Sequence, residues 1–149
     1  MREILFRGKR KSNREWIEGS AINTQYDVKG NKHIYIGVFK TSEGYPLMKF
    51  IEWFEVIPET VGQYTGLTDK NGKKIFEGDY IVCRQAIEGN FIDEHIEMGY
   101  VEMKHGAFGL HRKQGYYRPF KDWLEDYEYE VLGNIHDNPE LLKGDKSDA

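Results

Sequence analysis

Hydrophobic and polar residues alternate with a period of two along most of the chain, and this period predicts strands rather than helices. Ile4 and Phe6 occupy alternate positions, a polar turn follows at residues 9–13, and the alternation resumes at residues 15–18. This arrangement predicts a hairpin. A second hairpin is predicted over residues 27–34, because the Gly-Asn pair at its centre suits the positive φ angles of a tight turn.

The strand that follows the second hairpin is predicted to present Ile34, Ile36 and Val38 on one face. Residues 49–57 predict a further strand, which Pro58 ends because proline cannot donate a hydrogen bond to a ladder. A boundary is expected near this proline. The chain is therefore predicted to divide into two parts, residues 1–59 and residues 60–149.

The second part combines many turn signals with short alternating stretches. The apolar positions of residues 96–103 change phase beside Gly99, which predicts a β-bulge that bends the strand as a small barrel requires. Helix is predicted only as single turns, at residues 122–126 and after a capping Asn138. The predicted fold class is mainly β with minor helix: a strand-rich N-terminal part followed by a small C-terminal β-barrel.

Composition and cysteine usage narrow the class of protein. Hydrophobic residues make up 39% of the chain and aromatic residues 14%, which is enough to build a core. Cys83 is the only cysteine, so no intrachain disulfide can form, and the reducing cytoplasm is the expected location. No stretch is apolar enough for a signal peptide or a membrane span, so we expect no membrane association.

The net charge of −4 is unevenly distributed along the chain. Residues 1–14 contain six Lys or Arg against one acid, whereas residues 61–149 contain 11 bases against 17 acids, a local net charge of −6. The short basic stretch has two interpretations: a solvated rim of the first hairpin, or a contact surface for phosphate groups. Its candidate binding residues are Arg7, Arg10 and Lys11.

A second candidate surface combines aromatic and basic side chains nearer the C-terminus. It contains Tyr116, Tyr117, Phe120 and Trp123, interleaved with Arg112, Lys113, Arg118 and Lys121. Small barrels bind single-stranded nucleic acid by stacking its bases on aromatic side chains that lie beside cations. The same residues can instead cover the end of a barrel, with the basic side chains extending into solvent. The candidate binding residues of this surface are Tyr116, Tyr117, Arg118 and Trp123.

The chain carries no recognisable motif for catalysis, a cofactor or a metal. It contains no GxSxG nucleophile elbow, no P-loop and no GxGxxG loop, and its histidines lack metal-site spacing. Asp69-Lys-Asn-Gly72 followed by Glu77 partly matches a calcium loop, but Lys73 stands where an oxygen ligand is required. We interpret this segment as a turn. We expect no catalytic residue, no cofactor and no metal site, and a buried, unreactive Cys83.

Four segments carry a family resemblance: residues 6–10 (FRGKR), 15–19 (EWIEG), 56–79 (VIPETVGQYTGLTDKNGKKIFEGD) and 131–142 (VLGNIHDNPELL). In these segments the chain resembles the YopX family, small proteins encoded by phages and prophages of bacteria. The resemblance covers nearly the whole chain, and its central segment is highly specific. It implies a strand-rich N-terminal part and a C-terminal small barrel of the Src-homology type. It implies no activity, cofactor or catalytic residue.

The motif residues of the central segment have a mainly structural interpretation, because glycines supply turn angles and neighbouring acids accept hydrogen bonds from turn amides. These residues are Gly62, Thr65, Gly66, Asp69, Gly72, Glu77, Gly78 and Asp79. The alternative is a partner site on this segment, because loops on a rigid barrel commonly carry binding.

The sequence leads to one main hypothesis for function and two alternatives. The main hypothesis is a non-enzymatic phage or prophage accessory protein, a β-barrel interaction module that binds a protein partner or itself. The first alternative is a single-stranded nucleic-acid-binding module that uses the two basic surfaces described above. The weaker alternative is an enzyme that acts on a nucleotide, with Asp69, Glu77, Asp79 or His136 as candidate residues.

Overall fold

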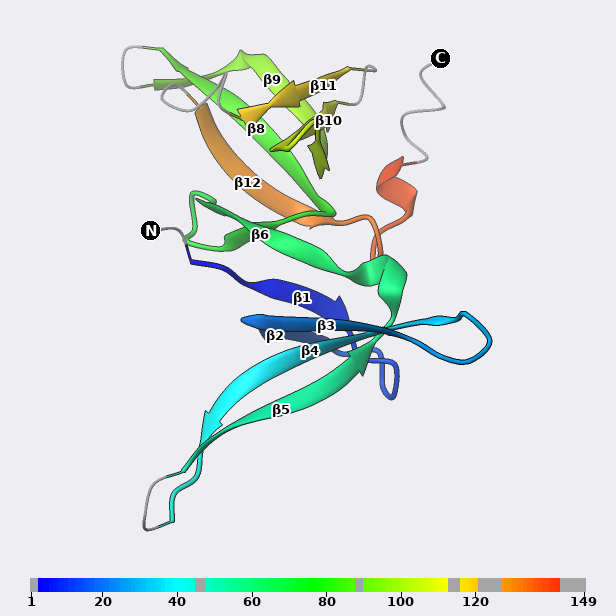
Figure 1. Ribbon diagram of the computed structural model, residues 1–149. Coiled ribbons are helices and arrows are strands. Elements are labelled where there is room, and N and C mark those ends of the chain that lie inside the picture. The colour runs from blue at the N-terminus through cyan, green and yellow to red at the C-terminus, as the bar shows by residue number, and fades with distance from the viewer. Residues whose placement is uncertain (1–2, 45–47, 88–89, 113–115, 121–126, 143–149) are drawn as a thin grey trace. The chain divides into compact units, whose positions relative to one another are not determined.

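Strands make up most of the computed structural model, which describes residues 3–44, 48–87, 90–112, 116–120 and 127–142. The chain forms two compact units, Met1–Tyr64 and Thr65–Ala149, and Figure 1 shows the strands of each. Helix within the described ranges consists of the 3₁₀ turn η1 (Pro58–Thr60), residue 120, which is also 3₁₀, and residues 140–142. The mainly β prediction is confirmed.

The first unit contains a hairpin and a three-stranded sheet. Its strands are β1 (Phe6–Lys9), β2 (Trp16–Gly19), β3 (Ala21–Tyr26), β4 (Lys32–Thr41) and β5 (Lys49–Val56). Strands β1 and β2 pair antiparallel, which confirms the first predicted hairpin. Strands β3, β4 and β5 neighbour one another in that order. The second predicted hairpin joins β3 to β4, and Gly30, but not Asn31, takes a positive φ of 82° in its turn.

Alternation along β4 places one of its faces against the core of the first unit. Ile34 and Ile36 are buried there beside Val56 of β5, and Val38 is half-buried. Partly buried side chains complete this core: Phe6, Ile17 and Val61. Strand β5 ends before Pro58, as predicted, because this proline starts η1.

The second unit is built on a five-stranded antiparallel sheet. The remaining strands of the chain are β6 (Gly62–Thr68), which begins in the first unit, β7 (Lys74–Phe76), β8 (Asp79–Ile87), β9 (Asn90–Lys104), β10 (Ala107–Arg112), β11 (Tyr117–Pro119) and β12 (Tyr127–Asn134). The sheet order is β11-β10-β9-β8-β12. This order leaves β11 and β12 at two edges in the described part of the chain, so the predicted barrel is not confirmed.

The core of the second unit lies against this sheet. Its buried members are Ile75, Ile81, Cys83, Val101, Phe108, Leu110, Phe120 and Tyr129. Cys83 is fully buried, and burial, followed by the nearby charge of Glu97, raises the pKa of its thiol. The expectation of a buried cysteine is confirmed.

The β-bulge predicted beside Gly99 is wrong. Gly99 pairs in regular register with Ile81 of β8 and with Arg112 of β10. The register of β8 and β9 shifts instead between Arg84 and Gln85. A side chain is excluded at Gly99 by close approach, because an added Cβ would lie 2.0 Å from the carbonyl oxygen of His111. Strand β9 lies between two neighbours and can carry apolar residues on both faces, so its change of phase needs no bulge.

The helical turn predicted after Asn138 is present, but the expected cap is not. The Oδ1 atom of Asn138 accepts a hydrogen bond from the backbone N–H of Asn134 at 3.2 Å, so it binds the end of β12 rather than the first helical amides. The backbone N–H of Leu141 donates to the carbonyl of Asn138. The helical turn predicted at residues 122–126 lies outside the described residues.

Candidate functional site

Arg7 is buried in the first hairpin, where it contacts an aromatic ring. The residue is 8% exposed, and its guanidinium carbon lies 4.6 Å from the ring centroid of Trp16. The ammonium of Lys9 lies 5.5 Å from the same centroid. The cation–π geometry places Arg7 in the packing of the hairpin. This burial leaves little of the residue to contact a phosphate in solvent.

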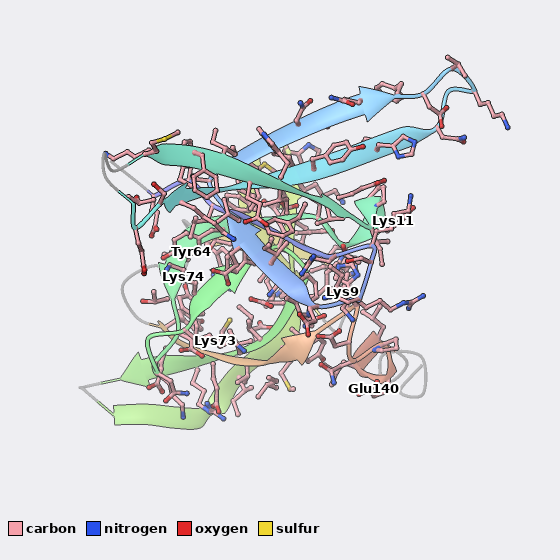
Figure 2. The ribbon with its side chains drawn as sticks, turned by 90° about the horizontal axis from the view of Figure 1, so that it is seen from below. Lys9, Lys11, Tyr64, Lys73, Lys74 and Glu140 are labelled. Atoms are coloured by element: carbon pink, nitrogen blue, oxygen red, sulfur yellow. The ribbon has the colours of Figure 1, made fainter. Side chains whose placement is uncertain are left out.

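Arg10 and Lys11 lie at an open pocket of about 380 Å³ beside β5. The pocket is lined by Arg10, Lys11, Ser12, Trp53, Phe54 and Glu55. The guanidinium carbon of Arg10 lies 4.7 Å from the ring centroid of Phe54, and the ammonium of Lys11 lies 3.1 Å from Oε2 of Glu55. Figure 2 draws Lys11 and Lys9 as sticks with the rest of the hairpin. The pocket therefore combines cations, aromatic rings and one carboxylate.

His33 joins two carboxylates from different elements. Its Nδ1 lies 2.8 Å from Oε2 of Glu55 on β5, and its Nε2 lies 3.1 Å from Oδ2 of Asp27 in the β3–β4 turn. The hydrogen bond with Glu55, and then the one with Asp27, raises the pKa of His33. The same contacts lower the pKa of Asp27 to about 2 and lower the pKa of Glu55. The contacts therefore favour the charged forms of all three groups.

One face of the sheet β3-β4-β5 carries large apolar side chains that stay exposed. Residues directly opposite each other in a sheet share a face, and Phe39 is opposite Ile51 while Gly37 is opposite Trp53. We call the apolar and amide-bearing part of this face the outer face; it consists of Asn23, Gln25, Tyr35, Gly37, Phe39, Ile51 and Trp53. His33 and Glu55, which lie opposite Gln25 and Tyr35, share the same side of the sheet. An added Cβ on Gly37 would lie 2.9 Å from both the Ile51 and Trp53 side chains, so these two side chains meet across the glycine.

The outer face also contains a second open pocket, of about 360 Å³. Asn23, Gln25, Tyr35 and Trp53 line it. It offers two aromatic side chains beside two amides, without a charged group among its lining residues. Such a surface suits recognition of an uncharged segment of another chain.

The aromatic-basic surface near the C-terminus is only partly available for binding. Phe120 belongs to the core and packs edge-to-face on Tyr129, and the hydroxyl of Tyr117 donates to the backbone carbonyls of Lys104 and Ala107. Tyr116 is 75% exposed. Of the remaining candidates, Arg118 pairs with Leu110 through β11, and Trp123 lies outside the described residues.

Asp69 organises the turn that the sequence predicts at residues 69–72. Its Oδ1 accepts hydrogen bonds from the backbone N–H groups of Asn71 and Lys73, each at 2.9 Å, and its Oδ2 accepts one from Val131 at 3.1 Å. Burial acts to raise the pKa of Asp69, but these backbone hydrogen bonds outweigh it and the pKa is lowered. The carboxylate is thus occupied by amides, as in an Asx turn.

The other motif residues also take part in turns and buried hydrogen bonds. The hydroxyl of Thr65 donates to the carbonyl of Ile75 at 2.8 Å, and Oδ2 of Asp79 accepts from the backbone N–H of Phe76 at 2.8 Å. Three of the motif glycines have positive φ: Gly66, Gly72 and Gly78. Gly62 is buried opposite Arg7, and Glu77 is half-buried. These contacts are those that the structural interpretation of the motif predicts.

Three of the residues considered for an enzyme take part in hydrogen bonds with backbone groups or within a turn. Asp69 and Asp79 accept hydrogen bonds from turn amides, and the backbone N–H of His136 donates to Oδ1 of Asn134. Within the described ranges, no group of three or more His, Cys, Asp or Glu side chains is arranged to hold a metal ion. The same ranges include no helix with the length and apolar character to cross a membrane.

Sequence reasoning missed both the outer face and the contacts of His33. The signal for the outer face lies in residues 49–57, where Phe50, Ile51, Trp53 and Phe54 put apolar residues on both faces of one strand. One of these faces meets the core, so the other had to remain exposed. No local pattern signals the His33 contacts, because Glu55 comes from a different strand.

Comparison with known proteins found one matching family and a similar solved structure. Residues 5–143 match the family model described as YopX protein. Among solved structures, the chain is similar to the crystal structure of protein EF1440 from Enterococcus faecalis, with 26% sequence identity and a TM-score of 0.54 over 93% of this chain and 97% of that one. A comparison with curated proteins found no match. Because the family model spans nearly the whole chain, the protein belongs to the YopX family.

Proposed function

We propose that this chain is a non-catalytic interaction module that binds a protein partner through the outer face. The observation that carries this proposal is the exposure of three large apolar residues on that face: Phe39 is 61% exposed, Trp53 43% and Ile51 37%. Single exposed apolar side chains are common on protein surfaces, whereas adjacent ones mark interaction sites. The register of β4 and β5 makes these three adjacent.

The charges around the sheet favour a protein partner over a polyanion. Lys11 forms an ion pair with Glu55, and Lys40 forms one with Glu52. These two positive charges are therefore compensated by carboxylates, whereas binding to a phosphate backbone depends on uncompensated Lys and Arg. Trp and Tyr side chains, both present on the outer face, are enriched at the centres of protein interfaces.

The proposed setting is that of a phage- or prophage-encoded accessory protein in the cytoplasm of a bacterial host. Membership of the YopX family supports the accessory role. The reducing environment is supported by Cys83, a single thiol that is fully buried in the core.

Capture of partners from an extract of host bacteria tests the proposal. A double variant, Phe39→Ser with Ile51→Ser, removes most of the exposed apolar surface. The matched control is Tyr116→Ser, which removes a more exposed aromatic side chain from the second unit. Urea unfolding first verifies that both variants are folded.

We expect a protein that is captured quantitatively by the wild type and by the control, and is lost with the double variant. Identical capture by all three chains would overturn the proposal, and so would the absence of any captured protein.

Single-stranded nucleic acid is the second candidate, and the pocket at Arg10 favours it. Arg10 and Trp53 both line this pocket, and side chains of these types bind a phosphate and stack on a base. Fluorescence anisotropy with a labelled oligothymidylate at low salt tests this candidate. Binding should weaken steeply with added salt and disappear in the Arg10→Glu, Lys11→Glu double variant. No binding at low salt excludes it.

A further inference from the structure

Strand β3 presents an open backbone edge. Strand β4 pairs with one side of β3 along its whole length, from Ala21 opposite Gly37 to Tyr26 opposite Lys32. The other side has no neighbouring strand in the described sheet, and residues 22–26 are exposed. Figure 1 shows β3, in blue, running with β4 into their shared turn. An edge of this kind offers a row of N–H and C=O groups to a further strand.

The composition of β3 leaves this edge unprotected. The strand reads Ala-Ile-Asn-Thr-Gln-Tyr, with no charged residue and no proline, and its register with β4 is uninterrupted. Natural edge strands usually carry a lysine, a proline or a bulge that prevents pairing with another chain. The absence of all three on β3 is compatible with pairing as its role.

The pleat restricts how two copies of β3 can pair. Along a strand, successive residues direct their N–H and C=O groups to opposite sides, so every second residue points toward the open edge. When two copies of this edge pair antiparallel, an even-numbered residue lies opposite an even-numbered one and an odd-numbered residue opposite an odd-numbered one. The numbers of two opposite residues therefore have an even sum. A two-fold axis at Thr24 satisfies this condition and uses the whole exposed stretch 22–26.

This register pairs side chains of matching chemistry. Thr24 faces Thr24 of the second copy, Asn23 faces Gln25, and Ile22 faces Tyr26. Pairs of threonines, and pairs of a β-branched with an aromatic residue, are among the favourable cross-strand contacts. The neutral strand also meets itself without repulsion between like charges.

We infer that two copies of this chain associate by antiparallel pairing of their β3 strands about a two-fold axis at Thr24. The inference goes beyond the proposed function, because it concerns the open backbone edge of β3 rather than the outer face. The axis is perpendicular to the sheet, so the outer faces of the two copies form one continuous surface. The pocket lined by Asn23, Gln25, Tyr35 and Trp53 then lies beside the junction.

Charge substitution at the axis tests the inference in the full-length chain. In Thr24→Lys two ammonium groups face each other across the axis, and in Thr24→Glu two carboxylates do, so each variant alone should lose association. An equal mixture of the two variants should recover it. Sedimentation velocity across a range of concentrations should give twice the chain mass of 17.5 kDa for the wild type and for the mixture, and 17.5 kDa for each variant alone.

The matched control is Val28→Lys, which adds the same charge at a fully exposed turn position outside the paired stretch and should still dimerise. A wild type that remains at 17.5 kDa overturns the inference, and this includes the case in which β3 pairs only with a different protein. Association that survives Thr24→Lys also overturns it. A mixture that fails to recover association overturns the two-fold register.

The outcomes separate this inference from the proposed function. Partner capture that depends on Phe39 and Ile51, together with a monomeric wild type, would retain the proposed function and remove the dimer. A dimer sensitive to Thr24→Lys, together with no captured partner, would retain the dimer and remove the proposed function.

Discussion

The Oδ2 atom of Asp69 accepts a hydrogen bond from the backbone N–H of Val131 at 3.1 Å, although 62 positions separate the two residues in the chain. The other oxygen of the same carboxylate accepts two hydrogen bonds within its own turn. One buried side chain therefore closes the turn between β6 and β7 and also attaches it to β12. This double use explains how a polar residue can belong to the core of the second unit.

Replacing Asp69 by Ala is expected to lower the free energy of unfolding by about 2–5 kcal/mol, because three backbone N–H groups lose a charged acceptor. The N–H groups of Asn71 and Lys73 can bind water instead, since both residues are exposed. Urea denaturation measures the change. Asp69→Asn keeps one acceptor oxygen for the turn and should cost less. Equal effects of the two substitutions would contradict the assigned roles of the two oxygens.

Gly99→Ala is expected to destabilise the second unit by about 1–3 kcal/mol, because the new methyl group would press on the backbone of β10. The Cβ would lie 2.0 Å from the carbonyl oxygen of His111, which cannot move without shifting the strand. The control is Gly44→Ala, where the added Cβ meets no atom within 4 Å and the cost should stay below about 0.5 kcal/mol. Thermal unfolding compares the two variants. Similar midpoints would refute the close approach.

Stability is expected to decrease as the pH rises above about 6.5, the unfolded value for histidine. The folded pKa of His33 is raised by Glu55 and Asp27, so its stabilising contribution is fully present below the unfolded pKa and is lost as the pH rises through the folded one. His33→Gln should remove this dependence, and the exposed turn variant His105→Asn should keep it. Urea unfolding at a series of pH values provides the measurement.

At acid pH the stability of the fold is expected to change in the opposite direction: it decreases as the pH falls. The pKa of Asp27 is lowered to about 2 and that of Glu55 is lowered as well, so their contribution is present above about pH 4 and is lost as the pH falls through the folded values. NMR titration of the His33 imidazole gives an independent check that Glu55 and Asp27 raise its pKa. A titration midpoint at or below the ordinary histidine value would contradict the assignment.

Cys83 is expected to react with a thiol reagent only when the second unit opens. The residue is fully buried and its thiol pKa is raised, so both access and the thiolate form are suppressed in the native state. Labelling with a chromogenic disulfide reagent at mildly alkaline pH should be slow in buffer and fast in denaturant. Fast labelling of one thiol per chain in buffer would show that this core is accessible.

Local features of the chain were predictable because they depend on neighbouring residues. Side chains alternate between the two faces of any strand, so the period of two was enough to place β4 and β5. The turn at Asp69–Gly72 was predictable for a similar reason, since the Asx contacts and the positive φ of Gly72 act over four residues. The family was identified separately, by resemblance in four segments of which residues 56–79 are the longest.

Long-range pairing accounts for the features that sequence reasoning missed or misplaced. Alternation shows that a strand has two faces, but the neighbouring elements determine which face is covered, and so Phe39 and Trp53 on the outer face became visible only with the register of β4 and β5. The shift between β8 and β9 depends on which residues oppose Arg84, and the burial of Arg7 depends on the position of Trp16 across the hairpin. Such contacts join distant positions, and their free energy is set by packing that no short stretch of sequence contains.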